Sequence, residues 1–104
     1  MTGIRIEMDG LGQAELAADA LYGVNTLRAV QNFPLSGRPI ASAPHFIWAL
    51  ALVKQAAAQA NLELGAISSD RADAIVTACR DIGQGLYDEH FVVDMLEGSG
   101  GTST

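Results

Sequence analysis

The feature of the sequence that most constrains the fold is an unbroken apolar run of eight residues, Phe46 to Val53. The run lies in the first half of Ala43 to Leu64, a segment that predicts a long helix. Ser42 is a candidate N-cap, Pro44 stands in the first turn, and Gly65 is placed to end the helix in a left-handed cap. A helix without a polar face must be buried on several sides, and a chain of 104 residues has only a thin core to offer. We therefore expect part of the cover to come from residues outside this chain or from other subunits.

Length, charge and composition limit the classes of protein to consider. The 104 residues make one domain or a piece of one, and a net charge of −6 without a basic patch argues against nucleic acid as a partner. The apolar run is far shorter than the ~20 residues needed to span a bilayer, and no apolar stretch follows Met1. The sequence therefore predicts a soluble, cytoplasmic protein without a membrane segment. One cysteine and two separated histidines match no metal-site spacing, so we expect no metal.

The rest of the chain predicts a mainly α fold with a small β-hairpin at the N-terminus and about three helices. Ile4 to Asp9 alternates apolar and polar residues as a half-buried strand does, and a glycine-containing turn leads to a second strand over Ala14 to Leu16. A short helix is predicted within Tyr22 to Phe33 and is closed by Pro34, which cannot continue it. Leu35 to Ala41 is expected to be a loop.

The third helix is predicted from about Asp70 to Leu86, with Ser69 as its cap. Two glycines, Gly83 and Gly85, weaken its last turn. Phe91 to Leu96 is an apolar stretch whose pattern fits either a strand or a helix. The apolar residues of the third helix follow steps of three and four, as in a packed bundle: Ala72, Ile75, Cys79, Ile82 and Leu86.

The chain ends in a stretch of glycine, serine and threonine that runs from Gly98 to Thr104. Glycine allows backbone N–H groups to approach a ligand closely, and consecutive N–H groups form a nest that suits a carboxylate or phosphate. The hydroxyls of Thr102, Ser103 and Thr104 can donate to the same anion. The residues alone leave two interpretations, an anion-binding cradle or a frayed chain end rich in small polar residues.

No single residue elsewhere completes an active site. His45 and His90 have no partner nucleophile or paired carboxylate at a telling spacing, which favours surface or capping roles. Cys79 is interpreted as a small core residue, and Lys54 as a side chain that extends from an apolar helix to water. Arg28 either grips a carboxylate ligand in bidentate fashion or forms an ordinary salt bridge.

Four segments of the chain, in order and in register, resemble a known family. They are residues 5–12, residues 21–33, residues 53–61 with 64–65, and residues 91–94 with 101–104. Together they are similar to the aspartase/class II fumarase superfamily of lyases over essentially the whole chain. Residues 26–29 with 32–33 resemble the aspartate ammonia-lyase branch, as does Ser103, where fumarases usually carry glutamine. Three residues depart from the common pattern of the family. The family often has alanine at the position of Gly100, and Asn25 and Glu97 are not the commonest residues at theirs. These departures keep the exact substrate open.

The resemblance implies a reversible anti-elimination, which in aspartases converts L-aspartate to fumarate and ammonia without a metal or organic cofactor. A base removes a proton beside the β-carboxylate, and donors aimed at the developing aci-carboxylate dianion stabilise it. The residue of the family that matches Thr102 contacts the substrate. By resemblance, therefore, Thr102, Ser103 and Thr104 bind substrate, and Gly100 and Gly101 supply close backbone approach. No catalytic residue is expected within this chain.

The resemblance also implies a homotetramer whose active sites draw residues from three subunits. Residues 1–104 then correspond to a truncated N-terminal lyase domain without the central helical bundle and the C-terminal domain, and we expect the isolated chain to be inactive. Two alternatives stay open. One is a class II fumarate hydratase, which adds water in place of ammonia. The other is a non-catalytic helical interaction module that associates through the apolar face around Trp48.

Overall fold

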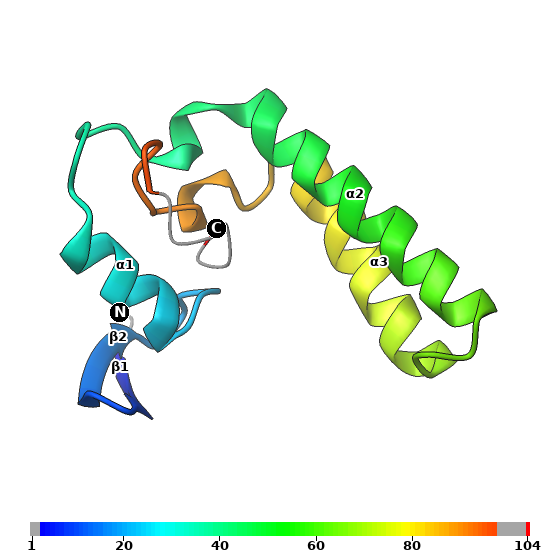
Figure 1. Cartoon of the computed structure of the whole chain (residues 1–104), viewed down its shortest axis with the longest axis horizontal. Helices are drawn as coiled ribbons and strands as arrows, with labels where there is room; N and C mark the ends of the chain where they lie inside the picture. The colour runs from blue at the N-terminus through cyan, green and yellow to red at the C-terminus, as the bar shows by residue number, and fades with distance from the viewer. Residues whose placement is uncertain (1–2, 98–103) are drawn as a thin grey trace. The chain divides into compact units, whose positions relative to one another are not determined.

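The computed structural model describes residues 3–97 and 104 and divides the chain into two units. The first unit comprises Met1–Ser42 and Glu89–Thr104, and the second comprises Ala43–Asp88. Figure 1 shows a β-hairpin and the short helix α1 in the first unit, and the long helices α2 and α3 in the second. The predicted mainly α class, with a small N-terminal hairpin and three α-helices, is confirmed for the described residues.

The hairpin pairs strand β1 (Ile4–Asp9) with strand β2 (Gly12–Ala17) in antiparallel register. The predicted alternation is present in β1, but the burial is the opposite of what we expected, because the apolar residues do not form the inner face. The apolar side chains are exposed and the charged ones are half-buried. A period of two fixes which residues share a face, and the partners available on each side decide which face is turned inward. The inner face of β1 consists of Arg5, Glu7 and Asp9.

The guanidinium of Arg5 explains why this charged face is turned inward. Its Nε donates to Glu7 Oε2 at 2.8 Å. Its two terminal nitrogens donate, over 2.5–3.2 Å, to four backbone carbonyls, one at the last residue of β2 and three in the stretch that links β2 to α1. A single side chain thereby pairs several carbonyls where the chain leaves β2 and runs toward α1. The four acceptors belong to Ala17, Ala18, Ala20 and Tyr22.

Glu7 fixes the start of helix α1 (Val24–Asn32). Its Oε1 accepts the N–H of Val24 at 2.8 Å, so a strand carboxylate sits at the helix N-terminus, where the macrodipole favours negative charge. The N-cap residue, Gly23, has no side chain for this task, and a Cβ there would meet Glu7 Oε1 at 3.0 Å. The helix ends at Asn32, two residues before Pro34, as the sequence predicts.

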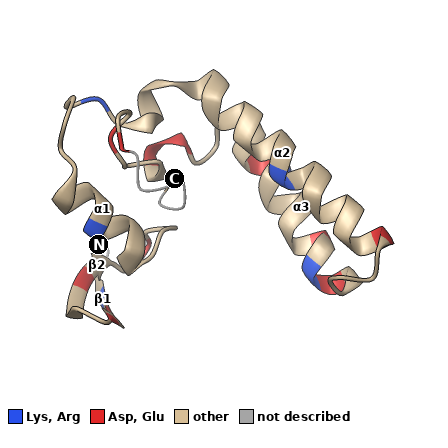
Figure 2. Ribbon diagram, in the orientation of Figure 1, with Lys and Arg blue, Asp and Glu red and all other residues tan. Residues whose placement is uncertain are grey.

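In the second unit, α2 (Pro44–Glu63) and α3 (Ser69–Gly83) lie side by side and run in opposite directions, as Figure 1 shows. Small side chains dominate the buried seam between them, because alanine lets two helix backbones approach closely. The charged positions of α2 are only Lys54, midway along the helix, and Glu63 at its end (Figure 2). The buried residues of the two helices are Ile47, Ala51, Ala58, Ala72 and Cys79.

The large apolar side chains of α2 lie outside this seam. Phe46, Trp48 and Leu52 are 47%, 51% and 44% exposed, and Val53 is 66% exposed. The burial on several sides that the apolar run predicts is therefore not provided by the described part of the chain. That the cover comes from elsewhere stays a prediction.

The predicted seam of α3 is correct at Ala72 and Cys79 and wrong at Ile75 and Leu86. Ile75 is 39% exposed, and Val76 is half-buried in its place. Steps of four and three from Ala72 lead through Val76 to Cys79, so the seam follows one of two spacings that the sequence allows. Leu86 lies beyond the end of the helix and is 55% exposed.

The ends of α2 agree with the prediction at one terminus only. Gly65 follows the helix with a φ of +74°, so the left-handed cap is confirmed. The predicted N-cap, Ser42, is wrong, because Ala43 occupies that position. Ser42 closes a short 3₁₀ helix, η1 (Ile40–Ser42), and its hydroxyl donates to the carbonyl of Pro39 at 2.7 Å.

The cap of α3 lies one residue earlier than predicted. The hydroxyl of Ser68 accepts the N–H of Arg71 at 3.3 Å, and Ser69 is the first helical residue. Two adjacent serines offer the same chemistry, and the backbone decides between them, since Ser68 has the extended conformation that an N-cap needs.

Replacing each of the two serines tests this assignment. Ser68→Ala is expected to lower the free energy of unfolding by about 1 kcal/mol, because an N–H in the first turn of α3 loses its acceptor. Ser69→Ala is the matched control, and it should leave stability unchanged or slightly raised, because alanine is the better helix former. Urea unfolding followed by circular dichroism measures both. Equal losses, or a larger loss at Ser69, would contradict the cap.

Candidate functional site

Most of the predicted substrate-binding residues fall outside the described part of the chain. Gly100, Gly101, Thr102 and Ser103 are among those not described, and Thr104 is described and exposed. Their role as donors to a carboxylate therefore stays a prediction. The structure does describe the segment that leads to them, residues 91–97.

Residues 91–97 form neither the strand nor the helix that their apolar pattern left open. The segment carries one isolated antiparallel bridge, between Pro39 and Asp94, and then turns at Met95 and Leu96. Three backbone hydrogen bonds of 2.8–2.9 Å join it to residues 38–41. Val93, at its centre, is 1% exposed. The approach to the end of the chain is thus held against a loop of the same unit.

Asp94 is the one charged side chain that is buried among the described residues, with 8% of its surface exposed. Its Oδ2 accepts the N–H groups of Ser36, at 2.8 Å, and of Gly37, at 3.0 Å. Its Oδ1 accepts the hydroxyl of Ser36 at 2.9 Å and the N–H of Leu96 at 2.8 Å. Four donors replace the water that the carboxylate leaves, and so it is buried without a counter-charge.

These donors also set the protonation of Asp94. The N–H of Leu96, followed by the donors of Ser36 and Gly37, holds the pKa of this carboxyl below its usual range. Burial acts in the opposite direction and raises the pKa, but the hydrogen bonds outweigh it. The group is therefore ionised at neutral pH, as four donors require.

The sequence did not single out Asp94 beyond its place in a family segment. Ser36 donates to it from 58 positions away, and spacing along the chain does not reveal such a pair. The available signal was weaker: Asp94 is the charged residue inside the apolar stretch Phe91 to Leu96.

A small hollow of about 170 Å³ lies beside this carboxylate in the first unit. Its walls come from the end of α1, from the loop that follows and from the approach to the chain end. The walls are mostly apolar, and both oxygens of Asp94 are already occupied by the four donors. The hollow therefore presents no set of donors for a dicarboxylate. Its lining includes Val30, Phe33, Pro34, Pro39, Val92 and Asp94.

Arg28 is engaged within the unit. Its Nε donates to Asp9 Oδ2 and its Nη2 to Asp9 Oδ1, both at 3.2 Å, and Nη2 also lies 3.3 Å from the carbonyl of Gly12. Of the two interpretations of this arginine, the salt bridge is confirmed. The hydrogen bond from Arg28, together with the N–H of Leu11, holds the pKa of Asp9 below its usual range.

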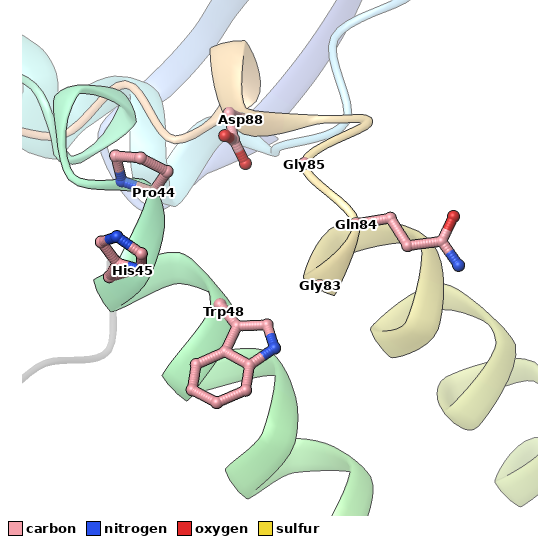
Figure 3. Close-up of a pocket in the computed structure, with 7 residues that line it drawn as sticks. All are labelled: Pro44, His45, Trp48, Gly83, Gln84, Gly85 and Asp88. Carbon is pink, nitrogen blue, oxygen red and sulfur yellow. The ribbon is translucent and has the colours of Figure 1, made fainter.

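A second, larger pocket of about 620 Å³ lies in the second unit and contains none of the predicted site residues. In Figure 3, His45 and Trp48 project from α2, the Asp88 carboxylate lies across the gap, and the Gln84 side chain turns away. Asp88 Oδ1 is buried and accepts no hydrogen bond from the described residues. An acidic oxygen beside exposed rings does not suit an anionic substrate. The remaining lining residues are Pro44, Gly83 and Gly85.

The other singled-out residues have the plain roles that the sequence favoured. His45 is exposed, and His90 accepts the N–H of Leu21 through Nδ1 at 3.2 Å. Cys79 is 6% exposed, and burial raises the pKa of its thiol, so it is a neutral core residue. Lys54 is exposed. Within the described residues, no three His, Cys, Asp or Glu side chains gather in a group that could hold a metal ion.

Comparison with known proteins defines the class. The model of a lyase family matches residues 12–104. An aspartate ammonia-lyase from Pseudomonas aeruginosa is 54% identical over 96% of this chain and 21% of that protein. A class II fumarate hydratase from Halobacterium salinarum is 47% identical over 96% of this chain and 21% of that protein. The crystal structure of a fumarate lyase:delta crystallin from Brucella melitensis superposes with a TM-score of 0.90 and 46% identity, covering 97% of this chain and 22% of that one.

The chain therefore belongs to the aspartase/class II fumarase superfamily of lyases. It spans about a fifth of the length of the curated relatives that it matches, and these include both ammonia-lyases and fumarate hydratases. The family match favours a lyase over the non-catalytic interaction module. Among the described helices, none is both long and apolar enough to cross a membrane.

The carboxylates of the first unit predict how stability depends on pH. The folded pKa values of Glu7, Asp9 and Asp94 lie below their usual range. Their contribution is fully present above the unfolded pKa of about 4 and is lost as pH falls through the folded values. The free energy of unfolding should therefore decrease steadily once the pH falls below about 4.

Urea unfolding at a series of pH values measures this dependence. Asp94→Asn should make the curve shallower, because one of the three groups no longer titrates. Glu15→Gln, at an exposed position of β2, is the control for replacing a carboxylate by an amide in the same unit. An unfolding free energy that is constant across the acid range would contradict the stabilising role of these groups.

Proposed function

We propose that this chain is the N-terminal part of an aspartate ammonia-lyase, which converts L-aspartate reversibly to fumarate and ammonia by anti-elimination. The observation that carries the proposal is the 54% identity to the Pseudomonas aeruginosa aspartate ammonia-lyase across 96% of the chain. Residues 26–29 with 32–33 support the ammonia-lyase branch, and so does Ser103, where fumarases usually carry glutamine.

In this proposal the end of the chain forms one wall of the substrate pocket. The hydroxyl of Thr102 donates to the carboxylate that carries the developing negative charge, and backbone N–H groups at Gly100 and Gly101 approach it closely. Ser103 and Thr104 shape the same wall. Such donors act through fixed geometry and require neither a metal nor an organic cofactor.

The base that removes the proton belongs to residues outside this chain. Among the described residues, His90 already accepts a backbone N–H, and Cys79 is buried and neutral. We also place the chain in a cytoplasmic homotetramer, whose other parts complete the site. The exposed apolar surface of α2, around Trp48 and Val53, supports the presence of covering residues.

A class II fumarate hydratase is the second candidate. The 47% identity to the Halobacterium salinarum enzyme over the same share of the chain favours it. The two reactions share the carbanion-like intermediate and differ in the leaving group, ammonia or water. Residues that recognise the common dicarboxylate therefore do not separate them.

Substrate choice by the full-length protein tests the proposal. With L-aspartate the protein should form fumarate, followed by its ultraviolet absorbance, and with L-malate it should form little or none. The 104-residue chain alone should turn over neither substrate, because it lacks the base. Faster turnover of malate than of aspartate would replace the proposal with the fumarase alternative, and turnover by the isolated chain would contradict the absence of catalytic residues.

The role of Thr102 is tested by a matched pair of substitutions in the full-length protein. Thr102→Val keeps the shape and removes the donor, so kcat/KM should fall by about 10²-fold or more, as when one donor to a developing oxyanion is lost. Thr102→Ser keeps the hydroxyl and should retain most of the activity. Both variants should unfold at the wild-type temperature. Near-normal kinetics in Thr102→Val would remove this residue from the site.

A further inference from the structure

Asp94 joins two stretches of the first unit that are far apart in sequence. One oxygen binds the loop at Ser36 and Gly37, and the other binds the hydroxyl of Ser36 and the N–H of Leu96. No charged donor takes part in these four bonds. The backbone itself is held, so the carboxylate fixes the path of the main chain on both sides.

The held stretch leads directly into the predicted substrate-binding residues. The N–H of Glu97 donates to the carbonyl of Asp94 at 3.0 Å, and the N–H of Met95 donates to the carbonyl of Arg38 at 2.8 Å. Residues 94–97 thus form a turn whose start is fixed by the side chain and the main chain of Asp94. The residue after this turn is Gly98, the first of the glycine-rich stretch.

A hydrogen-bonded carboxylate restrains this turn more sharply than an apolar contact would. Hydrogen bonds weaken steeply when the donor angle departs from linearity, whereas apolar burial has no direction. Donors aimed at a developing charge must be placed closely, and an error of about 1 Å can cost 10²-fold in rate. Directional bonds of this kind hold residues 94–97, the last described residues before the glycine-rich stretch.

We propose that Asp94 is a positioning residue for the lyase reaction: without touching substrate, its carboxylate holds the turn at residues 94–97 and so sets the origin of the substrate-binding stretch that ends at Thr104. The inference rests on the proposed function, because it needs that stretch to bind substrate. The inference adds Asp94 to the residues on which the reaction depends. Asp94 acts through the backbone that it holds, and this role requires its charge as well as its shape.

Asp94→Asn separates charge from shape. The amide has nearly the size of the carboxylate, but its NH₂ group replaces one acceptor oxygen with a donor. If the NH₂ lies at the Oδ2 position it faces the N–H groups of Ser36 and Gly37, and at the Oδ1 position it faces the Ser36 hydroxyl and the N–H of Leu96. Either orientation leaves a backbone N–H opposed by another donor.

Asp9→Asn is the matched control. Asp9 is also a carboxylate of the first unit with a lowered pKa, and it accepts the N–H of Leu11 and two bonds from Arg28. Its partners lie in the hairpin and α1, apart from the turn at residues 94–97. It reports the kinetic effect of losing a structural carboxylate in this unit.

The experiment compares the full-length wild type with both variants at a temperature well below their unfolding transitions. For ammonia elimination from L-aspartate, Asp94→Asn should lower kcat/KM by roughly 10- to 100-fold, with most of the loss in kcat, because the donors are misplaced in the transition state. Asp9→Asn should stay within about threefold of wild type, a change smaller than one lost hydrogen bond usually causes. Ser36→Ala removes only the hydroxyl, one of the four donors, and leaves the three N–H donors in place, so it disturbs folding less. It should give a loss of kcat/KM between those of the other two variants.

Different results separate the failure of this inference from that of the proposed function. Unchanged kinetics in Asp94→Asn or in Ser36→Ala would overturn the positioning role, as would a loss equal to that of Asp9→Asn. A wild-type protein that turns over neither aspartate nor fumarate would overturn the proposed function, and this inference with it. If Asp94→Asn fails to fold, Ser36→Ala with its kcat and KM decides.

Discussion

Directional hydrogen bonds to ionised side chains fix the loops and element ends of the first unit. Arg5 donates to four carbonyls, and Asp94 accepts three N–H groups and a hydroxyl. Glu7 stands at the N-terminus of α1. Each of these groups pairs backbone in a loop or at the end of a strand or helix, where unpaired polar groups would otherwise be costly. The path of the loops is therefore set by a few side chains at defined points.

The second unit depends on a different constraint, the close approach of two helices. Ala51, Ala58 and Ala72 lie in the seam, so little apolar area is buried for each residue. Trp48 and Val53, which could bury much more, are exposed instead. A helix pair of this kind is weakly stabilised by its own contacts. The chain spans about a fifth of the length of the curated relatives that it matches, and in the proposed function the rest of the protein covers these side chains.

The sequence predicted the elements of the fold better than the contacts between them. Periodicity located β1 and the third helix, the apolar run and its end signals located the long helix, and glycine chemistry located the left-handed cap at Gly65, because these signals are local. The predicted cap of α3, Ser69, was wrong by one residue, because the neighbouring Ser68 offers the same hydroxyl and has the extended backbone that an N-cap needs. The sequence also missed the inward turn of the charged face of β1, because that depends on carbonyls more than ten residues away. For the predicted site, resemblance placed the residues and the structure describes only Thr104 among them.

Hydrogen bonding also explains the importance that we give to Asp94, a residue that the periodicity of the sequence does not reveal. Elimination through a dianionic intermediate depends on donors that are in place before the charge develops, since reorganising them during the reaction would raise the barrier. A glycine-rich stretch allows close approach to a ligand but does not limit its own conformations. In our proposal the restraint comes from the residues that flank this stretch. Asp94 supplies such a restraint on residues 36–37 and 96. Each of its oxygens accepts two hydrogen bonds, and these bonds tolerate little displacement of the donors.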